Sequence, residues 1–421
     1  MSERVVESHL QDWITTTLGE LCAAGGGNIQ TGPFGSQLHA SDYVPFGIPS
    51  VMPQNIGDNI IIEDGIARIT TEDAARLSRY LLRDGDIVYS RRGDVERRAL
   101  VRPSEDGWLC GTGCLRVRLG DSAEAPFISY YLGHPNVREW IVRHAVGATM
   151  PNLNTRILSA VPVLLPPRHT QKAIAALLGA LDNKIAANGR IAHNARQLGD
   201  ALLKESSVSW RAMRISDLAS EGMLAFGDGY RTKRAEHGRP GLPILRVAEV
   251  RDGWIDAALE DYVSDHYLPA MGAKLSKPGD VVLTTKGTVG RVAVIRRDSP
   301  EFVYSPQLCY FRPLQSGPLT TAFLFFWFRS ESFWSQAHSL KSQTDMADYL
   351  NLGDIRSLRI EVPASTEAHA VVAKLDALEK TASQCHLESE SLAELRDTLL
   401  PKLISGEVQI REAEKVVENA V

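Results

Sequence analysis

The chain has 421 residues, enough for two or three domains that each bury their own hydrophobic core. Hydrophobic residues make up 44% and charged residues 23% of the sequence, a balance typical of globular proteins. The formal net charge of −5 excludes a protein that binds nucleic acid through an overall basic surface, so any contact with DNA must come from local basic clusters.

Cysteine usage and hydropathy predict the compartment. The five cysteines are odd in number and widely scattered, and the first residues, MSERVVESHLQDW, lack the features of a secretory signal. The most apolar run, residues 319–328, is about half as long as a membrane span requires and predicts a buried helix instead. We therefore expect a cytoplasmic protein with reduced thiols and no membrane contact.

The two halves of the sequence resemble each other, which indicates an internal duplication. WITTTLGEL begins at Trp13 and its counterpart WRAMRISDL begins at Trp210, an offset of 197 residues. Further matches follow in the same order, with the offset falling to 194 and then returning to 197, as expected for duplicated domains whose loops have diverged. The matches are GIP (47–49) with GLP (241–243), LLRDGDIVYSRRGDVERRALV (81–101) with LSKPGDVVLTTKGTVGRVAVI (275–295), and LNTRILSAVPVLLPP (153–167) with LNLGDIRSLRIEVPA (350–364).

Each half begins with a loop-rich domain and ends with a helical segment. Short strand-like runs such as GDIVYS and GDVVLTT alternate with clusters of Gly, Pro and Asn, which indicates an α+β domain. A Pro-rich stop precedes each helical segment. The predicted boundaries are 1–166 and 208–363 for the two α+β domains, 167–207 and 364–410 for the helical segments, and 411–421 for the tail.

A seven-residue repeat runs through both helical segments. A period near 3.5 over four heptads favours a coiled coil, and antiparallel pairing would make the chain pseudo-twofold symmetric. Some 35 residues of helix would extend roughly 50 Å, the scale of DNA-reading modules one helical turn apart. The alternative is two unrelated amphipathic helices, each packed on its own domain. The repeat comprises Ile174, Leu178, Leu181, Ile185, Asn188, Ala195, Leu198 and Leu202, matched by Val371, Leu375, Leu378, Ala382, Cys385, Leu392, Leu395 and Leu399.

Several motifs, taken in order, carry a family resemblance. They are TGPFGSQLHASDY (31–43), GIPSVMPQNI (47–56), the pair GDIVYSRRGD and GDVVLTTKGTVG, MPNLNTRILSAVPVLLPP (150–167), TQKAIAALLGALDNKI and LLPKLISGEV. No single motif is diagnostic. Their order, repeated around two heptad helices over nearly the whole chain, resembles the specificity subunit of type I restriction–modification enzymes.

The resemblance implies a non-catalytic DNA reader. Two target recognition domains would each read one half of a split sequence in double-stranded DNA, and the helices would act as a ruler between them. The helices would also dock two adenine methyltransferase subunits, to which translocase–nuclease subunits are added. This chain would carry no cofactor, because S-adenosylmethionine, ATP and Mg²⁺ would serve the partners.

Candidate DNA contacts in the first domain lie on two loops. The TGPFGSQ segment combines glycines, which allow close backbone approach, with small hydrogen-bonding side chains, although an ordinary turn has the same composition. The segment SRRGDVERR follows a strand and could direct guanidinium groups to guanine edges or phosphates, although a solvated charged face would look alike. The candidates are Thr31, Phe34, Gly35, Ser36, Gln37, Ser90, Arg91, Arg92, Arg97 and Arg98.

The second domain departs from the family pattern. It has GDGYRTKRAEHGRPG (227–241) in place of the GPFGS loop, which implies that the two halves read different half-sites. The GYRTKR segment places an aromatic ring among basic residues, and a mobile charged loop is the alternative. The candidates here are Tyr230, Arg231, Lys233, Thr285, Lys286 and Arg291, with Gln343 and Thr344 on a later loop.

The sequence predicts no catalytic or metal site. It lacks the catalytic Asn/Asp-Pro-Pro-aromatic tetrapeptide of adenine methyltransferases, a GxxxxGK[ST] phosphate loop and an HExxH zinc motif, and Cys110 and Cys114 form a lone CxxxC pair. Two alternatives to the leading hypothesis stay open. The same DNA reader could serve a solitary methyltransferase or another phage-defence assembly, or the chain could be a coiled-coil scaffold whose globular ends bind proteins.

Overall fold

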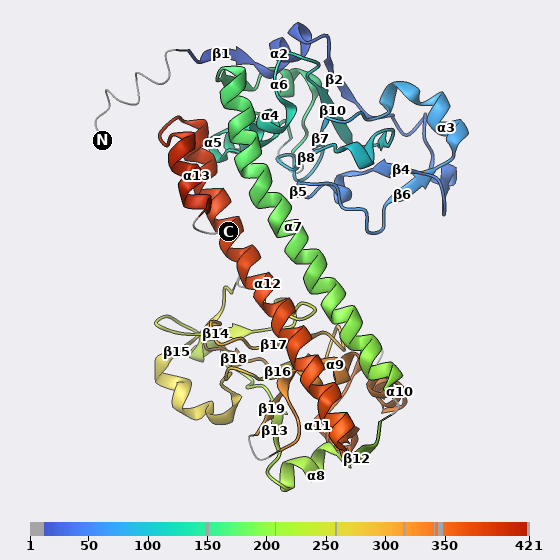
Figure 1. Cartoon of the computed structure of the whole chain (residues 1–421), viewed down its shortest axis with the longest axis vertical. Coiled ribbons are helices and arrows are strands. Elements are labelled where there is room, and N and C mark those ends of the chain that lie inside the picture. Colours follow the sequence, from blue (N-terminus) through green and yellow to red (C-terminus); the bar gives the residue numbers. More distant parts are fainter. Residues whose placement is uncertain are drawn as a thin grey trace. The chain divides into compact units, whose positions relative to one another are not determined.

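The computed structural model describes residues 12–147, 151–206, 208–256, 259–314, 317–340, 342–343 and 348–418. The chain divides into two compact units (Figure 1). Unit 1 comprises residues 1–186 and 389–421, and unit 2 comprises residues 187–388. Both boundaries fall inside long helices, so each unit contains one α+β domain and a part of each helix.

Unit 1 is built from both ends of the chain. Its elements are β1 (Ile14–Thr17), α2 (Leu18–Ala24), β2 (Asn28–Thr31), β3 (Tyr43–Val44), β4 (Ile48–Val51), β5 (Asp58–Asn59), β6 (Ala67–Ile69), α3 (Thr71–Arg76), β7 (Ile87–Ser90), β8 (Arg98–Leu100), β9 (Leu109–Cys110), β10 (Cys114–Arg118), α4 (Ala125–Leu132), α5 (Pro135–His144), α6 (Thr155–Ser159), β11 (Pro162–Leu165), the first half of α7 (Arg168–Glu205), the last part of α12 (Thr366–Ile404) and α13 (Ile410–Glu418).

Unit 2 is continuous in sequence. It contains the second half of α7 and the first part of α12. Its other elements are β12 (Trp210–Arg214), α8 (Ile215–Ser220), β13 (Leu224–Asp228), β14 (Gly241–Leu245), β15 (Tyr262–Ser264), β16 (Val281–Thr284), β17 (Val292–Val294), β18 (Val303–Tyr304), β19 (Leu308–Pro313), α9 (Thr321–Arg329), α10 (Glu331–Leu340), β20 (Ser342–Gln343), β21 (Asp348–Tyr349), α11 (Leu352–Ser357) and β22 (Arg359–Pro363).

The two α+β domains have the same strand topology. The order β2-β10-β7-β8 in unit 1 corresponds to β13-β19-β16-β17 in unit 2, and β6-β4-β9 corresponds to β15-β14-β18. In both domains the last pair of the smaller sheet, β4–β9 or β14–β18, is parallel, and the first and last strands pair with each other. These matched pairings confirm the predicted duplication.

The repeated Gly-Asp motif forms a buried ion pair in each domain. Asp86 accepts two hydrogen bonds from the Arg118 guanidinium, at 2.7 and 2.6 Å. Its counterpart Asp280, fully buried, accepts two from Arg312, at 2.6 and 2.7 Å, and one from the Tyr304 hydroxyl at 2.7 Å. Because a buried carboxylate needs such partners, this short motif recurs with its arginine at the same offset of 194 residues.

Removing this charge should destabilise unit 2. We expect Asp280→Asn to lower the free energy of unfolding by about 3 kcal/mol, because it leaves the Arg312 guanidinium in the core without its counter-charge. The measurement is the urea midpoint of the full chain. The control is Asp256→Asn, which breaks the half-exposed ion pair with Arg251 and should cost about 0–1 kcal/mol. Equal midpoints for the two variants would contradict the assigned role.

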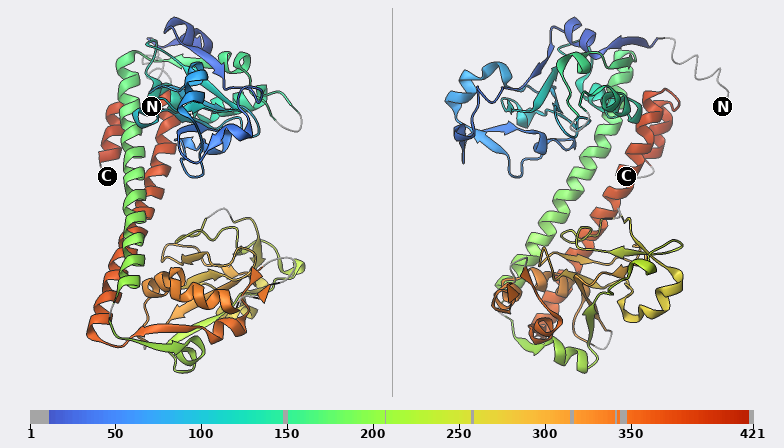
Figure 2. Two further views of the ribbon diagram at one scale, coloured as in Figure 1. Left: turned by 90° about the vertical axis from the view of Figure 1, so that its right-hand side faces the viewer. Right: turned by 180° about the vertical axis from the view of Figure 1, so that it is seen from behind.

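The two long helices pair in antiparallel fashion within each unit (Figures 1 and 2). In unit 2 the Asn188 amide donates to Glu388 (2.8 Å). Further toward the C-terminal end of α7, Arg196 pairs with Glu379 (3.2 Å). Residue numbers rise along one helix as they fall along the other. In unit 1 the predicted stripe supplies much of the interface, with Ile174, Leu178, Leu181, Leu392 and Leu399 buried. The paired helices of the prediction are therefore present.

The predicted stripe is wrong at Leu198, which is 53% exposed. The neighbouring Gly199 instead packs against α9 of the recognition domain. A Cβ atom on Gly199 would lie 2.3 Å from the Phe326 ring, so α7 approaches α9 so closely that only glycine fits. The packed face of the helix therefore moves by one residue at this point.

The apolar run at 319–328 forms α9 and is buried, as predicted. α9 packs on β16, β17 and β19 and supplies the aromatic centre of the unit 2 core. Its rings contact one another rather than solvent, which confirms a core role over a base-stacking surface. Among the described residues, no helix has the length and apolar character that a membrane span requires.

Candidate nucleic-acid interface

Three loops of the first domain meet at the ends of neighbouring strands. They follow β2, β7 and β9 and comprise residues 32–37, 91–97 and 111–113, which we call the first loop cluster. The backbone N–H of Gly32 donates to the Cys114 carbonyl (2.9 Å), and that of Arg91 donates to the Gly113 carbonyl (2.8 Å). A Cβ atom on Gly32 would lie 2.1 Å from a backbone oxygen, so glycine is required for this approach. The structure thus brings the two predicted loops together.

The first loop cluster presents the Phe34 ring and the Arg92 side chain to solvent, with the half-buried Arg91 beside them. Phe34 is 54% exposed, and the guanidinium carbon of Arg91 lies 5.9 Å from the centre of its ring. Arg92, Gly35 and Ser36 are also exposed. An aromatic face beside guanidinium groups can contact bases and phosphates together.

Two of the predicted DNA-contact residues, Gln37 and Ser90, form hydrogen bonds that stabilise the conformation of these loops. The Gln37 side-chain oxygen accepts from the Tyr80 hydroxyl (2.8 Å) and from the Phe34 backbone N–H (3.2 Å). Ser90 is buried, and its hydroxyl donates to the Arg92 carbonyl (3.1 Å). The Gln37 side-chain oxygen and the Ser90 hydroxyl are therefore engaged within the protein, where they support the neighbouring residues.

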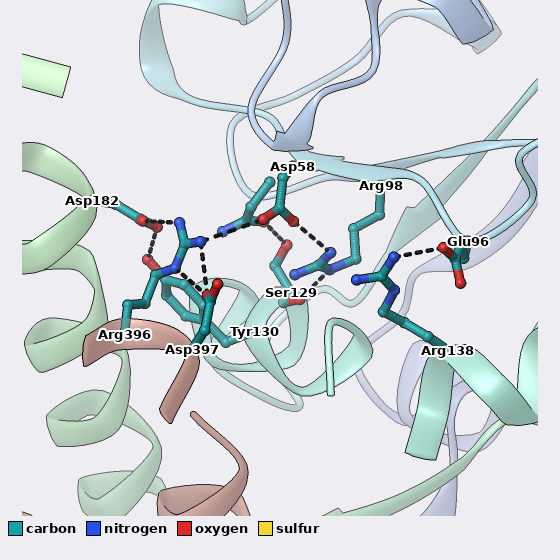
Figure 3. A network of polar contacts seen from close by, with 10 residues as sticks. Asp58, Glu96, Arg98, Ser129, Tyr130, Arg138, Asp182, Arg396 and Asp397 are labelled. Atoms are coloured by element: carbon teal, nitrogen blue, oxygen red, sulfur yellow. Dashed lines mark hydrogen bonds and ion pairs between the residues drawn. The ribbon is translucent and has the colours of Figure 1, made fainter. Parts of the chain in front are cut away.

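Three further candidates lie at the edges of these loops. Thr31 ends β2, is half-buried and pairs with Leu115 of β10. Arg97 is exposed and forms an ion pair with Asp94 of its own loop (2.5 Å). Arg98 is only 5% exposed, and its Nε–H donates to the carbonyl of Ser129 (2.6 Å), so it faces the interior (Figure 3).

The burial of Arg98 corrects its predicted place on the DNA-facing loop. A Cβ atom on Gly133 would lie 1.9 Å from the guanidinium, so the missing side chain at position 133 creates the space that Arg98 fills. Asp58 provides the counter-charge at 3.3 Å. Neither partner is near Arg98 in sequence.

The second domain has an equivalent arrangement, the second loop cluster, at residues 229–234, 285–291 and 305–307. The Gly229 N–H donates to the Leu308 carbonyl (3.1 Å), and the Thr285 N–H donates to the Gln307 carbonyl (2.9 Å). As with Gly32, a Cβ atom on Gly229 would lie 2.0 Å from a backbone oxygen, here that of Ser305. The same strand ends therefore carry loops of different sequence.

A basic hollow of about 410 Å³ lies within the second loop cluster. It brings together Arg231 and Lys286, which the sequence places on separate loops. Arg246, which directly follows β14, adds a third cation that also forms an ion pair with Asp261, and the described residues that line the hollow include no carboxylate. The lining comprises Arg231, Thr232, Ile244, Arg246, Lys286, Ser305, Pro306 and Gln307. Its charge suits phosphate oxygens or the acceptor edge of guanine.

The aromatic residue of the GYRTKR segment is anchored. The Tyr230 hydroxyl donates to the Glu236 carboxylate (3.3 Å), and its ring packs against a small apolar core. Lys233 is exposed on the same loop. Tyr230 therefore positions the loop, and its basic neighbours remain available to a ligand.

The other candidates of the second domain lie apart from the hollow or outside the described side chains. The Thr285 hydroxyl is buried and donates to the Gln307 carbonyl (3.1 Å). Arg291 is half-buried and donates to a backbone carbonyl at 3.5 Å. Gln343 lies in β20, but its side chain is outside the described residues, as is all of Thr344.

Unpaired buried donors mark both loop clusters. Among the described residues, Arg91 Nε and Thr112 Oγ1 in the first domain have no hydrogen-bond partner, and neither do Arg246 Nε and Ser305 Oγ in the second. Each such group costs about 1–3 kcal/mol. Two such groups lie at or beside each loop cluster, where another molecule can complete them, and others, such as Tyr89 Oη and Trp327 Nε1, lie elsewhere.

The sequence alone did not single out Arg246, Ser305, Gln307 or Thr112. One signal was present: Arg246 follows the shared strand motif at the position where the first half has Met52. Because the two halves share the fold but differ in charge at this position, the fold does not require an arginine there, and the residue is a candidate for a role in binding. The other three became visible only when β18 and β9 paired with distant strands.

The thiols are structural. Burial raises the pKa of Cys110 to about 12, and the Cys114 thiol donates to the Val51 carbonyl (3.2 Å). In the described part of the chain, no group of three or more His, Cys, Asp and Glu residues is placed to hold a metal ion.

Comparison with known proteins assigns the family. The profile of the type I restriction modification DNA specificity domain matches this chain twice, at residues 11–194 and 208–395. The chain belongs to the type I restriction modification DNA specificity family. The two matched regions each contain one loop cluster, in agreement with the duplication seen in the strand topology.

Two relatives in this specificity family come from Methanocaldococcus jannaschii. The type I restriction enzyme MjaVIII specificity subunit is 21% identical over 286 residues, which cover 63% of this chain and 66%, just under two thirds, of the relative. The MjaIX specificity subunit is 20% identical over 430 residues, 96% of this chain and 95% of the relative. Specificity subunits are the non-catalytic subunits of these enzymes, in agreement with the predicted lack of an active site.

A solved structure supports the fold. The crystal structure of the S subunit of a type I restriction–modification system from M. genitalium matches with a TM-score of 0.57 and 16% identity, covering 93% of this chain and 96% of that one. At this identity the match concerns the fold alone. It supports the predicted fold class, an α+β protein with two long helices.

Proposed function

We propose that this specificity-family protein reads a split sequence in double-stranded DNA, with one loop cluster on each half. Residues 1–166 and 208–363 are the proposed recognition domains, and residues 167–207 and 364–410 the spacer between them. The observation that carries this proposal is the pair of equivalent loop clusters, each with exposed cations and unpaired buried donors. Two copies of one site suit a ligand that repeats along its length.

The chemistry of the two loop clusters differs, which favours different half-sites. The first offers Phe34 beside Arg91 and Arg92, a set suited to a thymine methyl group or a base face together with a phosphate. The second offers three cations around a hollow, with Arg231, Arg246 and Lys286 directed to phosphates or guanine edges.

We propose that catalysis belongs to partner subunits in the cytoplasm. Two adenine methyltransferase subunits using S-adenosylmethionine would dock on the helical segments, and translocase–nuclease subunits would supply ATP- and Mg²⁺-dependent cleavage. Support comes from the family match and from the relatives named as specificity subunits of restriction enzymes. A solitary methyltransferase could use the same reader, and the neighbouring genes would distinguish the two.

The test is to express the chain with its cognate methyltransferase subunit in a host without adenine methylation and to map methylated adenines across the genome. We expect one motif with two fixed halves and an unspecified gap, and no methylation from either protein alone. Methyl transfer by the isolated chain, or a single uninterrupted motif, would contradict the proposal. A protein scaffold would produce no motif at all.

A further inference from the structure

A network of charged side chains joins the first recognition domain to the helix pair of unit 1 (Figure 3). Arg396 of α12 is its centre. The guanidinium bonds Asp182 of α7 (2.8 Å), Asp397 of its own helix (2.8 Å) and Asp58 of the recognition domain (3.5 Å). One side chain therefore touches both helices and the domain.

The network continues into the domain toward the first loop cluster. Asp58 also pairs with Arg98, which begins β8 directly after the loop that contains Arg91 and Arg92. Glu96 of the same loop pairs with Arg138 of α5 (2.5 Å). A continuous set of ion pairs thus connects α12 to the base of a loop that we assign to DNA contact (Figure 3).

The centre of the network is shielded from water. The Arg396 side chain is 17% exposed and that of Asp182 12%, and the Tyr130 hydroxyl donates to Asp182 at 2.5 Å. Burial acts to lower the pKa of Arg396, but its bonds to Asp182 and Asp397 raise that pKa above the ordinary value. The guanidinium therefore stays charged, and its geometry is fixed by directional bonds.

Unit 2 contains a similar set of contacts between its helices and its recognition domain. Arg196 of α7 pairs with Glu379 of α12 and donates to the Asp252 carbonyl (3.3 Å). Arg329 of the recognition domain binds Asp200 of α7 (2.9 Å) and the Asp252 carboxylate. In each unit a helix arginine, a domain arginine and an aspartate of the domain thus link the domain to its helix pair.

The acids of the two networks occupy equivalent positions of the repeat, whereas the arginines do not. Asp58 and Asp252 are counterparts in the repeat, as are Asp182 and Glu379. The arginines are not, because the position equivalent to Arg396 is Gly199. Each unit therefore reaches one contact set through arginines from different positions, which indicates that the contact set itself matters.

Stability alone does not explain these networks. Apolar residues of similar volume stabilise an interior as well as a buried ion pair does, and often better, whereas ion pairs fix orientation. A recognition domain held only by apolar contacts could tilt on its helices. We propose that Arg396 and Arg196 are positioning residues that fix the angle between each recognition domain and the helix pair of its own unit, and so set which gap between half-sites is accepted.

This proposal rests on the proposed function, and gap length is the readout that a purely structural role would not move. The test replaces Arg396 with Met, which keeps much of its length, in the full chain with its methyltransferase partner. Methylation is measured on DNAs that carry the native half-sites, with the gap varied in single base-pair steps. We expect methylation at the native gap to fall by about tenfold and the neighbouring gaps to be accepted at similar rates, with unchanged half-site sequences.

Three further variants keep the outcome decisive. Arg396→Lys retains the charge and should retain the native gap. Arg143→Met removes an exposed pair with Glu139 on α5 and should leave gap preference unaltered. If Arg396→Met does not fold, Asp58→Asn serves instead, since the Asp58 side chain is 65% exposed. A folded, active Arg396→Met or Asp58→Asn variant with the native gap preference overturns the proposal. Failure of the wild type to give a split motif would instead overturn the proposed function.

Discussion

Replacing Arg231 and Lys286 together with Ala should strongly weaken specific DNA binding at physiological salt. Both side chains line the hollow of the second loop cluster, and a cation that contacts a base edge contributes about 1–3 kcal/mol. Loss of both side chains should raise the Kd for DNA by roughly 100-fold or more. If both side chains contact phosphates, the number of counterions released on binding, measured from the slope of log Kd against log salt concentration, should also fall by about two. The measurement is a titration of labelled DNA containing the mapped motif at several salt concentrations.

The matched control removes the same charge from the opposite end of the same sheet. Lys277 and Arg297 are exposed on loops joined by the hydrogen bond from the Gly279 N–H to the Ile295 carbonyl (2.8 Å). Replacing these two with Ala should change Kd by less than about threefold. If both double variants weaken binding equally, the effect is one of net charge and the hollow is not the contact site.

Lengthening both helices by one heptad should change the target itself. Seven residues inserted after Ala186 and seven after Glu388 would preserve the face that each helix presents and the pairs on either side of the insertion. The added rise is about 10 Å, or roughly three base pairs of B-DNA. We expect the accepted gap to grow by that amount while both half-sites stay the same, as seen by methylation mapping.

The insertion in α7 alone provides the control. It would put the two helices out of register on one side of the insertion, and so break either the unit 1 pairs such as Asp182–Arg396 or the unit 2 pairs such as Asn188–Glu388. We therefore expect loss of folding or of all methylation. An unchanged gap in the double insertion would refute the ruler that the family resemblance implies.

Much of the fold could be predicted because its signals are local or repeated. Leu178, Leu181 and Leu375 lie in the packed face that their seven-residue spacing predicts. The Gly-Asp motif was visible as a repeat, and its buried ion pair explains why it is retained. Leu198 was misplaced because the deciding contact, that of Gly199 with Phe326, joins residues far apart in sequence.

The candidate site was predicted only in part, for the same physical reason. Arg91 and Arg231 were visible as charges on loops after strands. Arg246 was not, because its place in the hollow depends on the pairing of β14 with the distant β18. Arg98 looked identical to Arg91 in sequence, but the absence of a side chain at Gly133 draws it inside.

The division of the chain has a consequence for synthesis on the ribosome. Unit 2 is contiguous and is complete once residue 388 has emerged, whereas the core of unit 1 includes Leu392, Leu403 and Val417, which emerge after it. The core of unit 1 is therefore completed only after these late residues have been made, well after its first 186 residues. A nascent chain arrested before α13 should be recognised by chaperones and proteases at its first half while its later-made half resists them.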